Sequence, residues 1–118
     1  MMILHCMKAS DWELAKGQTH FGQASVTREG FVHCSPVNYF WRVAPLFQNE
    51  TEDLVLLCLD TEKITAPIKW EDGDNAGRFY PHVYGLVYTD AVTMVLPFLR
   101  DEQGRFVKNP ELFAYPDE

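Results

Sequence analysis

The chain has 118 residues, of which 47% are hydrophobic and 14% aromatic. This length predicts one domain, because about 100–150 residues can bury a single core without disulfide or metal support. Seventeen acidic residues outnumber ten basic ones, which gives a net charge of −7, and the basic residues are scattered along the chain. Non-specific binding to nucleic acid or to anionic membranes needs clustered Lys and Arg, so the composition argues against both partners.

The sequence also predicts the compartment. The uncharged apolar run at residues 91–99 has about half the length of a membrane-spanning helix. Residues 2–7 are apolar but lack the basic start and the cleavage site of a secretory signal. Cys6, Cys34 and Cys58 match no disulfide or metal-binding spacing, which suits small buried side chains in a reducing compartment. We therefore expect a cytoplasmic protein.

The first 30 residues predict one strand and one helix. Residues 2–7 are too short an apolar run for a helix and predict a buried strand. Ser10 and Glu13 have the spacing of a capping box, so a short helix is expected over about residues 11–16, with Trp12 and Ala15 facing the core. Residues 18–30 are polar without a sustained period. They predict a loop that contains one edge strand at most.

A brief strand is expected at residues 31–34, followed by a second helix. Ser35 before Pro36 is typical of an N-cap followed by the first helical position. Apolar residues then recur at helical spacing as far as Phe47. Pro45 interrupts this stripe, so the helix should end or bend near that residue.

The second half of the chain is dominated by strands. Residues 54–59 are apolar on both faces, as in a central strand, whereas the alternation of residues 68–71 predicts an edge strand. Residues 72–77 form a glycine-rich loop, and residues 91–98 the last strong strand. Because strands outnumber two early helices, the expected fold class is α+β. The tail beyond Arg100 should pack on the outside through Phe106, Leu112, Phe113 and Tyr115.

Three of the four histidines are candidates for a site. His20 lies in a polar segment and is expected at the surface. His5, His33 and His82 lie in apolar segments, where an imidazole needs a partner or a function. Each alone is more often a structural histidine. Three such residues in one short chain favour a shared pocket.

The local contexts suggest what this pocket could hold. His33 and Ser35 lie two residues apart at a strand end, where the first amides of the following helix would face an anion. Trp70 could stack on a planar ring, and Glu71 could stabilise positive charge. His82 and Tyr84 share one side of a strand. Zinc held by the three histidines is an alternative without a local motif, and Ser35 as a nucleophile lacks the Gly-x-Ser-x-Gly turn.

Several segments resemble one bacterial family. The strings EGFVHCS (residues 29–35), DLVLL (53–57), KWE (69–71) and FYPHVYG (79–85) are similar to those of domain-of-unknown-function family 952. The resemblance covers roughly residues 3–98 of a single domain 1–118, with residues 99–118 as a C-terminal extension. It implies a distant similarity to the ADP-ribosyltransferase fold, a split, strand-rich domain that grips NAD between two small sheets.

The resemblance also implies roles for the candidate residues. His5 would bond the ribose next to nicotinamide, and a carboxylate would stabilise an oxocarbenium-like transition state. No clear arginine pair is available for the pyrophosphate, because only Arg28 and Arg78 lie near the motifs in sequence. The residues expected to be catalytic are His33, His82 and Glu71; those expected to bind the ligand are His5, Ser35, Trp70, Tyr84 and Arg78.

Three functions follow as hypotheses. The first is a protein that binds NAD or a related nucleotide and transfers or hydrolyses its ribosyl group, with no cofactor beyond this substrate. The second is a non-catalytic module for a small ligand or a protein partner, and the third is a zinc-assisted hydrolase. The oligomeric state is not indicated. Residues 30–44 contain one basic residue, Arg42, and no acid, and residues 78–88 also lack acids. A locally neutral to basic pocket is therefore expected.

Overall fold

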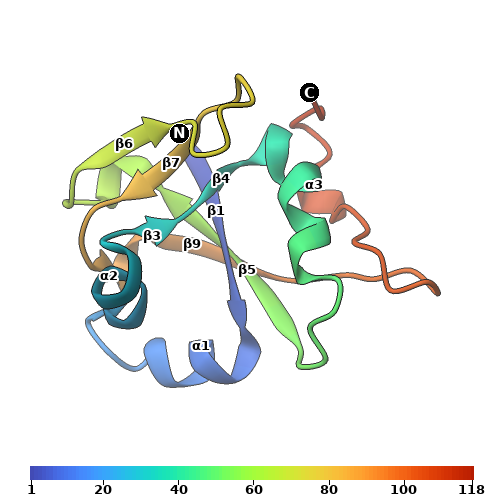
Figure 1. The fold of residues 1–118 in the computed structure, drawn as a ribbon. Helices are drawn as coiled ribbons and strands as arrows, with labels where there is room; N and C mark the ends of the chain where they lie inside the picture. The colour runs from blue at the N-terminus through green and yellow to red at the C-terminus, as the bar shows by residue number, and fades with distance from the viewer.

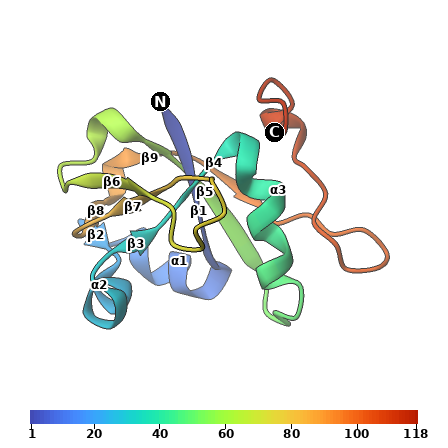
Figure 2. The ribbon, with the colours of Figure 1, turned by 45° about the horizontal axis from the view of Figure 1, so that its top comes forward.

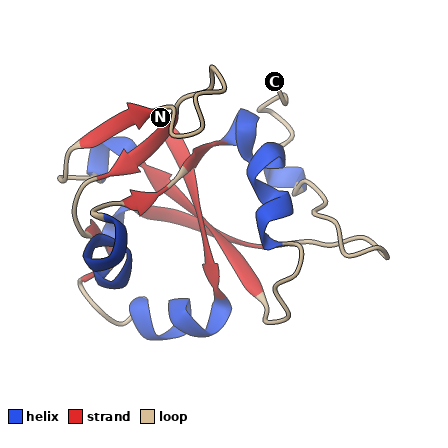
Figure 3. Cartoon of the chain, viewed as in Figure 1, coloured by secondary structure: helices blue, strands red, loops and turns tan.

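The computed structural model describes residues 1–118 and contains three antiparallel sheets with short helices around them (Figures 1 and 3). The fold class is α+β, as the sequence predicts. No helix has the length and the apolar character needed to cross a bilayer. The helices are α1 (Ala9–Ala15), α2 (Gln23–Glu29) and α3 (Phe40–Val43). The strands are β1 (Met2–Lys8), β2 (His20–Phe21), β3 (Val32–His33), β4 (Ser35–Pro36), β5 (Leu54–Asp60), β6 (Ile68–Glu71), β7 (Tyr80–Val83), β8 (Val87–Tyr88) and β9 (Val92–Pro97).

The largest sheet has the order β4-β1-β5-β9, which confirms that β5 is an interior strand. Its side chains alternate between the two faces with a period of two. Leu57 and Leu59 pack in one apolar cluster, whereas Leu54, Leu56 and Cys58 pack in the other. Full burial of such a side chain contributes about 1.5–3 kcal/mol, so β5 is a main source of stability.

The two apolar clusters lie on opposite faces of this sheet. The first contains Ile3, Phe21, Val32, Val83 and Val87, and Trp12 and Ala15 pack against it, as predicted for the first helix. The second contains Leu4, Phe40, Leu96, Phe98 and Leu112.

Helix α1 is present, but its predicted start is wrong. It begins at Ala9, directly after β1, because β1 continues in register with β5 as far as Lys8. Ser10 therefore lies inside the helix, and Lys8 at the N-cap makes no side-chain cap bond. The capping box does not form. Glu13 instead pairs with Lys16 at 2.6 Å.

Helix α2 replaces most of the loop predicted for residues 18–30. Its limits are two glycines in the left-handed region, Gly22 with φ 103° and Gly30 with φ 88°. None of its residues is fully buried, and Val26 is its contact with the first cluster. A helix with one partly buried apolar residue has no amphipathic stripe, which is why the pattern did not predict it.

The Ser35-Pro36 step was wrongly predicted as a helix start. These two residues form β4 and pair with β1, so the Ser35 hydroxyl caps no helix and donates to the carbonyl of Pro36 at 2.8 Å. The helical segment starts one residue later as a 3-10 turn, Val37–Tyr39, and continues as α3. The predicted break at Pro45 is confirmed, because α3 ends at Val43 and a second 3-10 turn, Ala44–Phe47, follows.

A second sheet has the order β3-β7-β6, with β6 at the edge, as its alternation predicts. A two-stranded ribbon of β2 and β8 completes the fold.

The tail packs differently from the prediction in two places. Leu112 is buried, and the Phe106 ring contacts Phe40 at 5.2 Å between centroids. Phe113 and Tyr115 were expected to pack as well, but they are 65% and 41% exposed. They follow the 3-10 turn Pro110–Leu112, whereas the chain end itself returns to the protein, where the backbone N–H of Glu118 donates to the Asn38 carbonyl oxygen at 3.0 Å.

Candidate functional site

A cleft of about 480 Å³ lies between the α3 segment and the β3-β7-β6 sheet. Its base comes from β1 and the start of β4, and Figure 2 shows these strands between α3 and the second sheet. Residues from both walls and the base line it. Among them are the three histidines singled out from the sequence, His5 on β1, His33 on β3 and His82 on β7.

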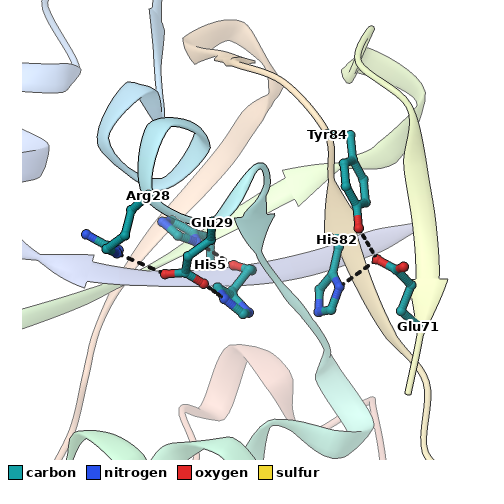
Figure 4. Close-up of polar contacts among 7 residues, drawn as sticks. His5, Arg28, Glu29, Glu71, His82 and Tyr84 are labelled. Atoms are coloured by element: carbon teal, nitrogen blue, oxygen red, sulfur yellow. Dashed lines mark hydrogen bonds and ion pairs between the residues drawn. The ribbon is translucent and has the colours of Figure 1, made fainter. Parts of the chain in front are cut away.

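His82 forms a hydrogen-bonded group with Glu71 and Tyr84 (Figure 4). Its Nδ1 lies 2.9 Å from Glu71 Oε1, and the Tyr84 hydroxyl donates to the same oxygen at 2.5 Å. The bonds from Tyr84 and His82 hold the pKa of Glu71 below its usual range, so this carboxylate is ionised and accepts. Nδ1 of His82 must then be the donor, so in the neutral tautomer that this bond selects Nε2 is the acceptor.

The ring of Phe31 fixes the positions of its aromatic neighbours. It stacks on His82 with 4.1 Å between centroids and 17° between planes. The same ring contacts His33 edge-on at 4.6 Å and Tyr84 at 5.2 Å. His33 and His82 consequently lie 5.2 Å apart between ring centroids. This packing limits the rotamers of the two imidazoles.

His5 is held in one tautomer by the backbone. Its Nδ1 donates to the His33 carbonyl oxygen at 2.6 Å, because a carbonyl can only accept. Burial is the largest influence and holds the pKa of His5 below its ordinary value of 6.5, against the opposing effect of this bond. The ring is therefore neutral at pH 7, and the acceptor nitrogen of this tautomer is Nε2.

His33 belongs to a second histidine–carboxylate pair. Its Nε2 contacts Glu29, whose other oxygen accepts from Arg28 Nε at 3.1 Å (Figure 4). The His33 bond is the main reason that the pKa of Glu29 lies below its usual range. The His33 side chain is 57% exposed, so it forms the rim of the cleft.

Three of the predicted ligand-binding residues, Trp70, Arg78 and Tyr84, do not line the cleft. A fourth, Ser35, lines it without a free hydroxyl. Trp70 lies next to Glu71 on β6, and adjacent strand residues point to opposite faces, so Trp70 does not line it. Arg78 lies in the β6–β7 loop and does not line it either. Ser35 lines the cleft but is 2% exposed and donates to Pro36, so it is neither a free donor nor a nucleophile. Tyr84 acts through Glu71 rather than on the wall.

Sequence reasoning missed four residues of the site. Phe31 and Arg42 line the cleft, as does Asp74 in the β6–β7 loop, and Glu29 holds His33. The charged side chains of the wall are Glu71, Asp74 and Arg42, so the prediction of a neutral to basic pocket is wrong. The reason is that two segments without acids meet a third, residues 71–74, which supplies two carboxylates.

The groups of the cleft suit proton transfer better than metal or thiol chemistry. No group of three or more His, Cys, Asp or Glu side chains is arranged to hold a metal ion. Cys6 and Cys34 also line the cleft, but burial raises the pKa of each thiol to about 12. Both thiols are therefore protonated at neutral pH and unreactive. What remains is a carboxylate with a hydrogen-bonded histidine beside a second, neutral histidine.

These features define a small α+β protein with a histidine- and carboxylate-lined cleft beside a split pair of sheets. A family model described as "Protein of unknown function (DUF952)" matches residues 6–95, and the chain belongs to this family.

Solved structures with the same fold come from protein CC0527 of Caulobacter crescentus. Its crystal structure has 27% sequence identity and a TM-score of 0.81, and the match covers 95% of this chain and 98% of that one. The solution NMR structure of CC0527 gives a TM-score of 0.69 with coverage of 88% and 90%. Among curated proteins, none matches the chain.

Proposed function

We propose that the protein is a cytoplasmic enzyme that binds NAD or a related nucleotide in the cleft and cleaves or transfers its ribosyl group. The observation that carries this proposal is the pairing of an ionised Glu71, bonded to His82, with a neutral His5 whose Nε2 can accept. The three free cysteines suit a reducing compartment.

The chemistry requires few groups, and the cleft contains them. In hydrolysis, the bond from C1′ of the ribose to the nicotinamide nitrogen breaks, and its electron pair neutralises the pyridinium. The leaving group needs no proton, so no general acid is required. A water oxygen bonds to C1′ and releases one proton, for which His82 Nε2 is the acceptor.

Glu71 and His5 act on the charge and on the position of the sugar. Glu71 stabilises first the cationic ring and then the oxocarbenium-like transition state. His5 Nε2 accepts from a ribose hydroxyl, a bond that strengthens as the sugar becomes positive. His33 contacts the part of the ligand nearest to solvent, where an acceptor other than water would enter.

The test is release of nicotinamide from NAD at neutral pH, quantified against a protein-free blank. Glu71→Gln and His82→Ala should each lower the rate by about 100-fold or more, the usual loss for an acid–base or electrostatic catalytic group. His33→Ala should lower it less. The matched control is His20→Ala, since His20 is exposed and lies outside the cleft.

Two outcomes would overturn the proposal. One is no nicotinamide above the blank, which leaves the non-catalytic binding module as the better description if NAD still binds. The other is turnover that Glu71→Gln and His82→Ala leave unchanged.

A further inference from the structure

Arg42 is the basic side chain in the wall of the cleft. It lies on α3, on the opposite side from the β6–β7 hairpin that carries Glu71, Asp74 and His82. Its side chain is partly exposed rather than buried in the core. Arg42 therefore contributes a positive charge to this wall of the cleft.

Two contacts hold the guanidinium group of Arg42. Its Nε donates to the backbone oxygen of Glu118 at 3.2 Å, and its guanidinium carbon lies 4.2 Å from the centre of the Trp41 ring. Neither contact uses the two terminal nitrogens. None of the six ion pairs in the structure includes Arg42. The planar end of the group is therefore oriented and available, as bidentate recognition of a phosphate requires.

The opposite wall has the opposite charge. Glu71 and Asp74 both line it, and neither has a Lys or Arg partner within salt-bridge distance. Tyr80 on β7 also lines the cleft: burial is the largest influence and raises the pKa of its hydroxyl, Arg78 and then Arg42 lower it, and Asp74 raises it. Arg42 and Asp74 thus both act on the Tyr80 hydroxyl, but they form no ion pair with each other. An uncharged ligand would have no charge–charge interaction with either wall.

We propose that Arg42 forms a phosphate subsite and that the cleft is built for a zwitterion, a nucleotide with a cationic base at the Glu71 wall and a phosphate at Arg42. This inference rests on the proposed function and names its substrate class. It predicts that neither the phosphate nor the cation alone is sufficient for tight binding.

Three matched ligands separate the two ends of the cleft. They are nicotinamide mononucleotide, nicotinamide riboside, which lacks the phosphate, and reduced nicotinamide mononucleotide, which lacks the positive charge. Calorimetry in the cold should show the first binding about tenfold or more tightly than each of the others, the scale of one charge-assisted hydrogen-bonded contact.

The variants should then separate the two preferences. Arg42→Gln should bind the mononucleotide and the riboside equally to within about twofold, but still prefer the oxidised to the reduced mononucleotide. Glu71→Gln should lose the preference for the oxidised form and keep the preference for the phosphate. Arg42→Lys, which keeps the charge without the planar fork, should retain an intermediate phosphate preference even if Arg42→Gln folds poorly. The matched control is Arg105→Gln, because Arg105 is exposed and lines a separate groove.

The same samples are assayed afterwards for released nicotinamide, so the two proposals fail separately. An equal affinity of the wild type for mononucleotide and riboside overturns the subsite, as does a phosphate preference that survives in both Arg42 variants. Arg42-dependent binding without any nicotinamide release supports the subsite and overturns the proposed reaction. Nicotinamide release together with binding that does not depend on Arg42 supports the proposed reaction and overturns the subsite.

Discussion

The two larger sheets of this protein differ in the kind of side chain that they carry. The four-stranded sheet is aliphatic at its centre, where Leu56, Leu57 and Leu59 are 0% exposed. The three-stranded sheet carries a hydrogen-bonded set of titratable groups, and Glu71 in it is 40% exposed. Apolar burial stabilises the fold, whereas partly hydrated polar groups can bind and exchange protons. Variants at the centre of the first sheet should therefore affect stability most, whereas variants of the titratable groups in the second sheet should affect mainly protonation.

The largest stability effect is expected in the centre of the first sheet. Leu57→Ala removes a fully buried side chain of β5 and should lower the free energy of unfolding by about 2–5 kcal/mol. Its cross-strand neighbour Val95 is 39% exposed, so Val95→Ala should cost less than about 1 kcal/mol. Urea denaturation measures both. Equal losses for the two variants would contradict the assignment of β5 as the stabilising strand.

A smaller loss is expected at the start of α2, where Gly22 packs against Val32 of the second sheet. At Gly22, with φ 103°, an added Cβ would lie 2.7 Å from Val32 Cγ2. Gly22→Ala should therefore destabilise the protein by about 1–3 kcal/mol. At Gly17 the nearest atom would be 3.9 Å away, so Gly17→Ala is the matched control and should be close to neutral. The melting temperatures of the two variants measure this difference. A melting temperature of Gly22→Ala as close to the wild type as that of Gly17→Ala would contradict the expectation.

His5 should make stability depend on pH. Because burial holds the pKa of His5 in the folded protein below its ordinary 6.5, the unfolded chain takes up the proton first. The buried neutral ring therefore adds to the free energy of unfolding. This added stability is complete above about pH 6.5 and is lost as the pH falls towards the pKa of His5 in the folded protein. His5→Gln should reduce the difference in urea midpoint between about pH 7.5 and pH 5.5. His20→Gln, at an exposed position, should keep the full difference; a His5 variant that kept it too would count against the buried, neutral ring.

The smallest expected effect is a shift in titration with little change in stability. The Tyr84 hydroxyl is the largest cause of the lowered pKa of Glu71, so Tyr84→Phe should raise that pKa. The carboxyl ¹³C signal of Glu71 should then titrate at higher pH, and the acidic limb of any activity profile should move with it. Tyr88→Phe is the control, since Tyr88 lies on β8 outside the cleft. An unchanged Glu71 titration would show that the 2.5 Å contact has no influence on this carboxylate.

The parts of the fold that were predicted correctly are those whose signal is local. β1, β5 and β9 are apolar runs, and β6 shows the alternation of an edge strand, so each could be assigned without its neighbours. β4 was missed because pairing with β1 overrides the N-cap preference of Ser35 before Pro36. α2 was missed because glycine torsions at its ends, rather than an apolar stripe, define it.

The candidate site was predicted where residue type and local sequence context together indicated chemistry. His5, His33, His82 and Glu71 were selected in this way, and all four line the cleft. Trp70 was placed wrongly, because it precedes Glu71 on β6 and points to the opposite face of that strand. The contributions of Glu29 and Arg42 depend on which segments the fold brings together, which no local pattern contains.

The most direct test of the central claim, a histidine–carboxylate cleft that receives a nucleotide, is a long-range ¹H–¹⁵N spectrum of the four imidazoles with and without nicotinamide mononucleotide. The free protein should show neutral His5 protonated on Nδ1 at pH 7.5. Addition of the nucleotide should shift the signals of His5, His33 and His82 and leave His20 in place. Protonation of His5 on Nε2, or shifts no larger at the cleft histidines than at His20, would contradict the account.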